Sequence, residues 1–266
     1  MTIKLVVTDL DDTLLDTSIR VPASAKACIQ KLQQAGVTVA IATGRMHMSA
    51  EAIAKDAGIT APIISFNGAM IRNPGEKEPI YHCPLTQQQV ELIFSLGFDD
   101  SLAVQYYAND ILYLRSWHPL SQQYIGDTRC QYQVFPQMEN AVAELGLPSK
   151  ILIAGEDATI QAIWRQAAAF QNVLYVTSSY HCFLEFLNPA SDKGTGVQAL
   201  GKLLGIPKEQ TLVIGDNYND RELFSGGEIK IAMGNAVDAL KEMATWVTVT
   251  NDQDGWAKAM ERFVLC

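Results

Sequence analysis

The chain has 266 residues, of which 48% are hydrophobic and 18% charged, and its formal net charge is −9. This length suits one large domain or two of ordinary size, and the hydrophobic share is high enough for a core, which excludes a stapled mini-protein or a disordered chain. The acidic balance has the wrong sign for a surface that binds nucleic-acid phosphates, so we expect no nucleic-acid partner.

The cysteines and the first residues indicate a cytoplasmic protein. The five cysteines stand singly, at positions 28, 83, 130, 182 and 266, without a Cys-x-x-Cys pair or a zinc-binding spacing. Acids interrupt the apolar run in MTIKLVVTDLDD, which argues against a signal peptide. No later stretch reaches the roughly 18 apolar residues of a membrane span. We therefore expect a reducing compartment, no membrane partner and, by default, a monomer.

The N-terminal part of the chain alternates short β-branched runs with helical stretches. The patterns predict strands at residues 3–7, 37–43 and 62–66, and helices at 22–36 and 48–58. This β-α-β-α-β order indicates a parallel sheet with right-handed crossovers. The dipeptide Asn67-Gly68 then predicts a hairpin from the third strand to residues 69–72.

A mixed α+β segment interrupts this order from about residue 81 to about residue 187. The patterns predict helices at 85–97 and 157–170, strands at 102–108, 111–116, 150–155, 173–179 and 182–187, and a poorly marked middle. Aromatic groups at 106–108, 117–118 and 178–182 suit either a substrate pocket or core packing.

Alternation of strands and helices resumes after Pro189. The patterns predict helices at 193–205, 219–227, 236–244 and the C-terminal end, and strands at 211–215, 229–234 and 246–250. The predicted fold class is therefore α/β, with a Rossmann-like parallel-sheet core formed by residues 1–80 and 188–266. An α+β cap domain, residues 81–187, is inserted into that core.

Acidic residues follow the first predicted strand, in Asp9-Leu10-Asp11-Asp12-Thr13. If this segment is extended, Asp9 and Asp11 project to the same side. Two neighbouring carboxylates repel each other unless a cation lies between them or one is protonated, and oxygen ligands suit Mg²⁺. Taken alone, the segment is also typical of an acidic turn that caps a helix.

Phosphate-binding groups follow other predicted strands. Thr43-Gly44-Arg45 offers a hydroxyl, a glycine that permits close approach, and backbone amides at a helix start. Lys193 begins a predicted helix, where its ammonium could neutralise a phosphoryl oxygen or keep a carboxylate ionised. Taken alone, the first is also an ordinary strand-to-helix turn and the second an exposed surface lysine.

A further carboxylate follows the strand at 211–215, in the segment Gly215-Asp216-Asn217-Tyr218-Asn219-Asp220. Asp216 could supply the remaining metal ligand, with Asn217 and Asp220 as its support. Taken alone, the segment is equally typical of an Asn/Asp-rich turn with a helix cap. Because the carboxyl ends of parallel strands meet at one edge of a sheet, these separate segments together predict a phosphoryl-transfer site.

These motifs resemble those of the haloacid dehalogenase-like hydrolases, and among them the Cof-type phosphatases with a C2-type (C2B-like) cap. The resemblance covers nearly the whole chain. It rests on D-x-D-x-T at Asp9–Thr13, on Thr43 with Gly-Arg after it, on Lys193 in S-D-K-G, and on G-D-x-x-N-D at Gly215–Asp220. The inserted segment also lies where the family carries its cap.

The resemblance implies a role for each of these residues. Asp9 would attack phosphorus, and Asp11 would protonate the leaving group and then deprotonate water. Mg²⁺ would be held by Asp9, the backbone carbonyl of Asp11 and Asp216, with Asp220 and Asn217 supporting them. The implied phosphate contacts are Thr43, the amides of Leu10 and Gly44, Lys193 and Asn219. Arg45 could reach either the phosphate or the cap, and Thr13 would be structural.

The implied function is a Mg²⁺-dependent phosphatase for small phosphorylated metabolites such as sugar phosphates, nucleotides, flavin mononucleotide or pyridoxal phosphate. Three alternatives stay open: a phosphosugar mutase that uses the same aspartyl-phosphate, a receiver-like signalling module, and a binding protein without catalysis. We expect the cap to select the substrate.

Overall fold

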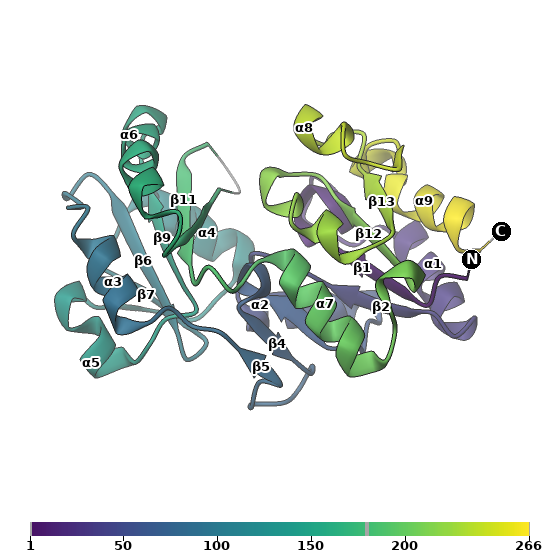
Figure 1. Cartoon of the computed structure of the whole chain (residues 1–266), viewed down its shortest axis with the longest axis horizontal. Helices are drawn as coiled ribbons and strands as arrows, with labels where there is room; N and C mark the ends of the chain where they lie inside the picture. The colour runs from purple at the N-terminus through teal and green to yellow at the C-terminus, as the bar shows by residue number, and fades with distance from the viewer. Residues whose placement is uncertain (1, 179–180, 266) are drawn as a thin grey trace. The chain divides into compact units, whose positions relative to one another are not determined.

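The computed structural model describes residues 2–178 and 181–265 of the chain (Figure 1). The chain divides into two compact units, Met1–Tyr81 with Asp192–Cys266, and His82–Ser191. In the described part of the chain, none of the helices is both long and apolar enough to cross a bilayer. That the second unit is a C2-type cap stays a prediction.

The first unit contains the predicted parallel sheet. Its strand order is β14-β13-β12-β1-β2, and all neighbouring pairs are parallel. The strands are β1 (Leu5–Thr8), β2 (Thr38–Ile41), β12 (Thr211–Gly215), β13 (Ile229–Ala232) and β14 (Trp246–Val247). Every residue of β1 and β12 is buried. These nearly continuous apolar strands are what a sheet covered on both faces requires, so the predicted fold class is confirmed.

The third predicted strand lies beside the parallel sheet rather than fully within it. β3 (Ile63–Ser65) meets the end of β2 at a single parallel bridge between Ala42 and Ile64. It pairs antiparallel with β4 (Met70–Arg72), and Ser65 lies opposite Met70, so the predicted hairpin is confirmed with residues 66–69 as its connection. β5 (Tyr81–His82) completes this small sheet.

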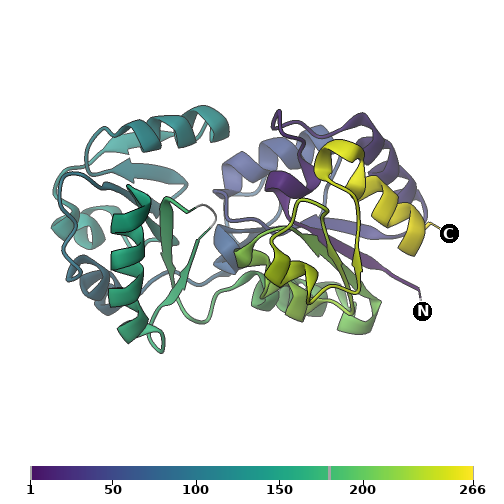
Figure 2. The ribbon, with the colours of Figure 1, turned by 90° about the horizontal axis from the view of Figure 1, so that it is seen from above.

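Helices cover both faces of the parallel sheet. The helices of this unit are α1 (Ala23–Gln34), α2 (His47–Ala57), α7 (Lys193–Leu204), α8 (Asp238–Lys241) and α9 (Gly255–Phe263). Figure 2 shows α1 and α2 on one face and α7 on the other, and α1 contacts both α2 and α9. Gly58, with a φ of 73°, ends α2 in the left-handed conformation that glycine adopts most easily.

Two predicted helices of the C-terminal segment are wrong or too long. Residues 219–227 form two short 3₁₀ turns, Tyr218–Asp220 and Leu223–Gly226, instead of an α-helix. A Cβ atom at Gly226 would lie 2.6 Å from the side chain of Val197, so close packing requires glycine here, and glycine is a poor helix former. The helix predicted at 236–244 is limited to the short α8.

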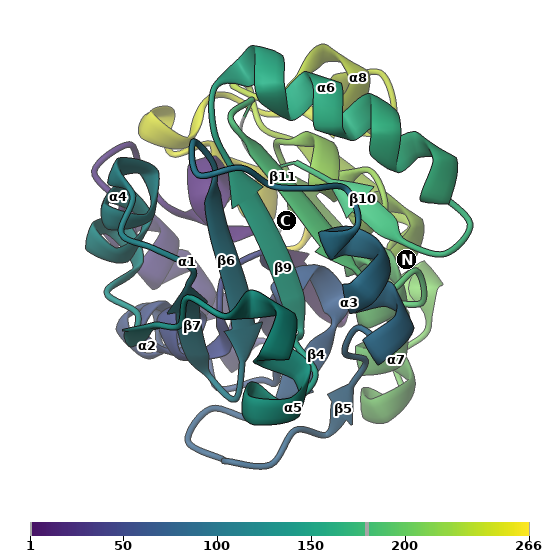
Figure 3. The ribbon, with the colours of Figure 1, turned by 90° about the vertical axis from the view of Figure 1, so that its left-hand side faces the viewer.

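The second unit is a six-stranded sheet with the order β10-β11-β9-β6-β7-β8. Its strands are β6 (Ala103–Ala108), β7 (Ile111–Leu114), β8 (Tyr132–Val134), β9 (Lys150–Ala154), β10 (Tyr175–Thr177) and β11 (Phe183–Leu187). Figure 3 shows three helices in front of one face of this sheet: α3 (Gln87–Phe94), α5 (Ala141–Leu145) and α6 (Asp157–Ala167). Their apolar residues share a core with Tyr106 and Phe186 of the sheet.

Three elements of this unit, α4 (Pro119–Thr128), β8 and α5, lie in the segment whose pattern predicted nothing. β8 is an exposed edge strand and therefore shows no alternation of buried and exposed residues. Tyr106 is fully buried, whereas Trp117 is 51% exposed, so the aromatic candidates do not form one group. Of the candidates at 178–182, Ser179 and Tyr180 lie outside the described residues.

Candidate active site

Asp9 and Asp216 lie side by side because the strands that precede them are neighbours. Asp9 follows β1, Asp216 follows β12, and these strands pair in parallel with Thr8 opposite Ile214. The Asp9 amide donates to the Ile214 carbonyl at 3.0 Å, which continues the ladder by one residue. Both carboxyl groups therefore stand at the carboxyl edge of the sheet, where α/β folds bind ligands.

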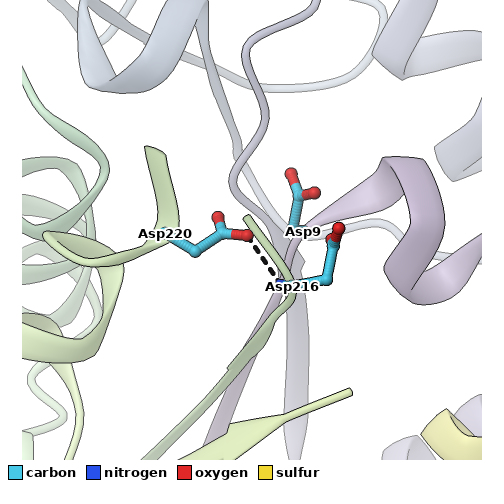
Figure 4. Close-up of side chains that lie close together, drawn as sticks. All are labelled: Asp9, Asp216 and Asp220. Carbon is cyan, nitrogen blue, oxygen red and sulfur yellow. Dashed lines mark hydrogen bonds between the residues drawn. The ribbon is translucent and has the colours of Figure 1, made fainter. Parts of the chain in front are cut away.

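Asp220 joins these two residues in a buried acidic cluster, shown in Figure 4. One carboxylate oxygen from each of the three residues lies within 4.8 Å of the others. Burial raises the pKa of Asp9 to about 7, against the pull of Lys193 and with the help of Asp220 and Asp11. Burial, Asp220 and Asp9 also raise the pKa of Asp216 well above its usual range. The cluster therefore carries negative charge at a real electrostatic cost.

Lys193 supplies the positive charge nearest to this cluster. It is the first residue of α7, its side chain is fully buried, and its Nζ donates to Asp9 Oδ1 at 2.7 Å and to Asp220 Oδ1 at 2.6 Å. Burial lowers the pKa of Lys193, but the carboxylates of Asp220 and Asp9 outweigh it and raise that pKa above its usual range. The ammonium is therefore held ionised, whereas the role predicted from the sequence, that Lys193 keeps a carboxylate ionised or neutralises a phosphoryl oxygen, stays a prediction.

The hydrogen bonds show which of the three carboxylates have an oxygen left for a cation. Asp220 uses both oxygens within the protein, since Oδ2 also accepts from the amides of Asp216 at 2.9 Å and Asn217 at 3.0 Å. Asp216 Oδ1 accepts from Thr13 Oγ1 at 2.6 Å. Among the described hydrogen bonds, none uses the second oxygen of Asp9 or of Asp216. These two oxygens, on side chains that are otherwise nine-tenths buried, form a hard, anionic donor set that fits Mg²⁺.

Asp11 lies outside the acidic cluster of Asp9, Asp216 and Asp220. The backbone is extended at Asp9 and at Asp11 and turns at Asp12, which has a φ of 55°. The Asp11 carboxylate pairs with Arg45, whose Nε donates to Oδ2 at 2.8 Å and whose Nη2 contacts Oδ1. Arg45 is 7% exposed and also donates to Ser49 Oγ at 3.3 Å. Its described side-chain contacts are thus made within the first unit.

The predicted phosphate contacts come together from two other loops. Thr43 is fully buried after β2, and its Oγ1 accepts from the Arg45 amide at 3.2 Å. Asn219, from the β12 loop, donates through Nδ2 to Asn67 Oδ1 at 3.2 Å. A Cβ atom at Gly44 would lie 3.0 Å from this same Asn67 oxygen, a tight contact that would push the Asn67 side chain aside.

The remaining predicted residues have local roles in the structure. Asn217 Oδ1 accepts from the Tyr218 amide at 2.8 Å, so this side chain caps the 3₁₀ turn that carries Asn219. The Leu10 side chain is fully buried, which fixes the start of the turn after Asp9.

Asn67 is a site residue that sequence analysis missed. The Asn-Gly pair predicts only a hairpin, but Asn67 also follows β3. The other site residues likewise follow strands, so a search of every strand end would have included Asn67.

Comparisons with known proteins agree with the motifs. A family model described as haloacid dehalogenase-like hydrolase matches residues 6–260. The chain is 26% identical to phosphatase YwpJ of Bacillus subtilis over an alignment of 286 positions, gaps included. The alignment covers 98% of this chain and 100% of that protein. It is 26% identical over 274 residues to the 5-amino-6-(5-phospho-D-ribitylamino)uracil phosphatase YitU of the same organism, covering 97% of each.

A solved structure extends this likeness to the fold. The crystal structure of a haloacid dehalogenase-like hydrolase from Bacteroides thetaiotaomicron has a TM-score of 0.85 at 26% identity, covering 98% of this chain and 99% of that one. The likeness thus spans both units and the motifs at the sheet edge. The chain therefore belongs to the haloacid dehalogenase-like hydrolases, the family that its sequence motifs predicted.

Proposed function

We propose that this protein is a Mg²⁺-dependent phosphatase that hydrolyses small phosphorylated metabolites through an aspartyl-phosphate intermediate. The observation that carries the proposal is the buried group of Asp9, Asp216 and Asp220 around the ammonium of Lys193 at the end of β1 and β12. A nucleophilic carboxylate, an adjacent cationic group and a cation site are the parts that phosphoryl transfer needs.

In the first step, an oxygen of Asp9 attacks phosphorus in line with the leaving oxygen. A bond forms between Asp9 and phosphorus, the bond from phosphorus to the leaving oxygen breaks with its electron pair, and Asp11 supplies the proton. In the second step, water attacks the same phosphorus and Asp11 takes its proton, while the bond from phosphorus to Asp9 breaks with its electron pair, which regenerates the Asp9 carboxylate and releases inorganic phosphate. Before the first step, Asp11 must leave Arg45, take up a proton from solvent and contact the leaving oxygen.

Other residues of the chain hold the reacting groups in place. Lys193 opposes the rise in the pKa of Asp9 that burial causes, and orients Asp9 through its 2.7 Å contact. Thr43, Asn219 and the amides of Leu10 and Gly44 would bind the phosphoryl oxygens and stabilise their charge. Asp9, the Asp11 carbonyl and Asp216 would hold Mg²⁺, which when bound supplies positive charge to the phosphoryl oxygens.

The relatives support the size and the class of the substrate. YitU is named for a phosphorylated ribityl compound, which is a small phosphate monoester, and YwpJ is named as a phosphatase. We infer the same class of substrate here. The cytoplasmic location and the monomeric state stay predictions from the sequence.

A panel of phosphorylated metabolites tests the proposal. Phosphate release is measured for sugar phosphates, nucleotides, flavin mononucleotide and pyridoxal phosphate, with Mg²⁺ and with a chelator. The variant Asp216→Asn should lose turnover, whereas Asp238→Asn, whose side chain is 97% exposed, is the matched control and should keep it. Lack of turnover on every compound, or full turnover in Asp216→Asn, would contradict the proposal.

The same panel separates the alternative functions. A mutase would depend on a bisphosphate activator and would yield an isomeric sugar phosphate instead of free phosphate. A receiver-like module would keep a phosphorylated form for minutes, which intact-mass spectrometry detects. Phosphate release in repeated turnovers without an activator is the result that we expect.

A further inference from the structure

The connection between β3 and β4 has an unusual backbone. Phe66, Asn67 and Gly68 all have positive φ, at 51°, 50° and 98°. Phenylalanine rarely adopts this conformation, and successive positive φ values cost free energy that the surrounding structure must offset. Phe66 and Asn67 are nevertheless 2% and 0% exposed. Such strain in a buried loop points to contacts that depend on it.

This connection binds the loop that carries Thr43 and Gly44. The Phe66 amide donates to the Arg45 carbonyl at 3.0 Å, and the Asn67 amide donates to the Thr43 carbonyl at 2.9 Å. The Thr43 carbonyl and the Gly44 amide belong to one planar trans peptide and point in opposite directions. The bond from Asn67 therefore sets the direction of the Gly44 amide.

The same connection reaches the other two loops of the site. Asn67 Oδ1 accepts from Asn219 Nδ2 at 3.2 Å, which fixes which end of the Asn219 amide faces Asn67. Gly68 lies against the residue before Lys193, since a Cβ atom at Gly68 would be 2.0 Å from the Asp192 carbonyl oxygen. Residues 66–68 thus contact the loop after β2, the loop after β12 and the residue before α7.

We propose that Asn67 is a positioning residue for phosphate, which aligns the Gly44 amide through its backbone and the Asn219 amide through its side chain. This inference rests on the proposed function, because that function makes Gly44 and Asn219 phosphate ligands. Asn67 is not among the described contacts of Asp9, Asp216 or Lys193. Its side chain should therefore affect phosphate binding without affecting the cation site.

Asn67→Gly tests the side chain alone, because glycine keeps the left-handed backbone and the bond to Thr43. Binding of inorganic phosphate to the Mg²⁺-loaded full chain, and of Mg²⁺ to the phosphate-free chain, is measured by titration calorimetry. We expect the Kd for phosphate to rise about tenfold, the effect of one hydrogen bond, with the Kd for Mg²⁺ unchanged. With a substrate from the panel, KM should rise by a similar factor.

Asn109→Gly is the matched control. Asn109 also has a positive φ, 52°, and its Nδ2 bonds a backbone carbonyl, that of Leu145 at 3.0 Å, but it belongs to the second unit. This variant should bind phosphate and Mg²⁺ like the wild type. If Asn67→Gly does not fold, Asn67→Ala, which also lacks the side-chain oxygen that accepts from Asn219, replaces it with the same expected direction.

The outcomes separate this inference from the proposed function. Wild-type phosphate affinity in the folded Asn67 variant overturns the inference, and so does an equal loss of phosphate and Mg²⁺ binding, which indicates a merely structural role. A wild type that binds phosphate but hydrolyses no ester contradicts the proposed function, while weaker phosphate binding in Asn67→Gly still supports the inference. A wild type that binds no phosphate overturns both.

Discussion

Each unit of the molecule buries a lysine against acidic side chains, but the charges around the two lysines differ. In the second unit, Lys150 Nζ donates to Glu185 at 2.9 Å and lies 4.9 Å from the centre of the Tyr107 ring. In the first unit, Lys193 Nζ donates to both Asp9 and Asp220, and Asp216 belongs to the same acidic cluster. All of these charged side chains are at least nine-tenths buried.

The difference shows how a buried charge that serves the fold can be told from one that serves a site. An ammonium that faces a carboxylate inside the protein is a neutral pair, whose loss leaves a buried charge behind. Three carboxylates near one ammonium leave an excess of negative charge. Burial, with the charges of Asp220 and Asp11, raises the pKa of Asp9 to about 7. Such a cluster becomes favourable only when a further cation or a proton arrives.

The largest expected effect is that of Asp9→Asn, which removes the nucleophile. Turnover should fall by about 10⁴-fold or more, because an amide does not form the phosphoryl intermediate. The fold should survive, since the substitution removes negative charge from an overcharged cluster and leaves Lys193 bonded to Asp220. Phosphate release and thermal unfolding measure the two effects.

Glu185→Gln is the control for Asp9→Asn, because it makes the same acid-to-amide change at the buried acid of the second unit. Glu185→Gln should lower the midpoint of thermal unfolding but leave the rate of phosphate release unchanged. Full turnover in Asp9→Asn would refute the assignment of the nucleophile.

Replacement of Lys150 or of Lys193 by methionine is the second test of the difference between the two buried lysines. Lys150→Met leaves Glu185 buried without its cation and should lower the free energy of unfolding by about 3–5 kcal/mol. Lys193→Met should cost a similar amount and should also abolish turnover. Chemical denaturation and phosphate release distinguish the two.

The double variant Lys150→Met/Glu185→Met sharpens this test. If Lys150 and Glu185 form a pair that serves only the fold, apolar side chains of similar volume should recover most of the lost stability. A double variant as unstable as Lys150→Met would show that Glu185 has a further role.

Much of the first unit could be predicted because its signals are local. The unbroken apolar runs of β1 and β12 require burial on both faces, and a parallel sheet brings the residues after those strands together. The sequence therefore predicts Asp9 and Asp216 as site residues, whereas Lys193 is distinguished from other lysines only in combination with the other motifs.

Other features depend on contacts or backbone conformations that a pattern does not contain. Asn67 is bonded to Asn219 across 152 positions of the sequence, so its role is visible only after folding. Asp11 is bonded to Arg45 across 34 positions of the sequence, a pairing that no local pattern contains. The edge strand β8 has no buried face and hence no alternation to detect.

Binding of Mg²⁺ should stabilise the protein in a pH-dependent way. In the metal-free chain, the pKa of Asp9 is about 7 against an ordinary value of 3.8, so the folded state retains a proton that the unfolded state has lost. The free energy of unfolding should therefore fall as the pH rises from about 4 to about 7. Asp216 acts in the same direction.

At about pH 7.5, Mg²⁺ at 100 times its Kd should then raise the free energy of unfolding by about 2.7 kcal/mol. At about pH 5 the effect should be smaller, because a proton on Asp9 competes with the cation. Thermal unfolding with MgCl₂ or a chelator at both pH values measures this, and Lys150→Met should show the same Mg²⁺ effect as the wild type. An equal Mg²⁺ effect at the two pH values would contradict the expected role of Asp9.

The smallest expected effect comes from Thr13→Val, which tests the support of the acidic cluster. Thr13 is 1% exposed, and its Oγ1 donates to Asp216 Oδ1 at 2.6 Å. Loss of this bond should lower the free energy of unfolding by about 1 kcal/mol and weaken Mg²⁺ binding several-fold, because Asp216 is then less well oriented. Thr128→Val removes a similar hydroxyl bond, 2.7 Å to the Tyr124 carbonyl, in the second unit. It should cost similar stability but leave the Kd for Mg²⁺ unchanged. If the two threonine variants changed that Kd equally, Thr13 would serve the fold alone. Asp216 would then not be shown to bind the cation, and the cluster near Lys193 would differ less from the Lys150–Glu185 pair.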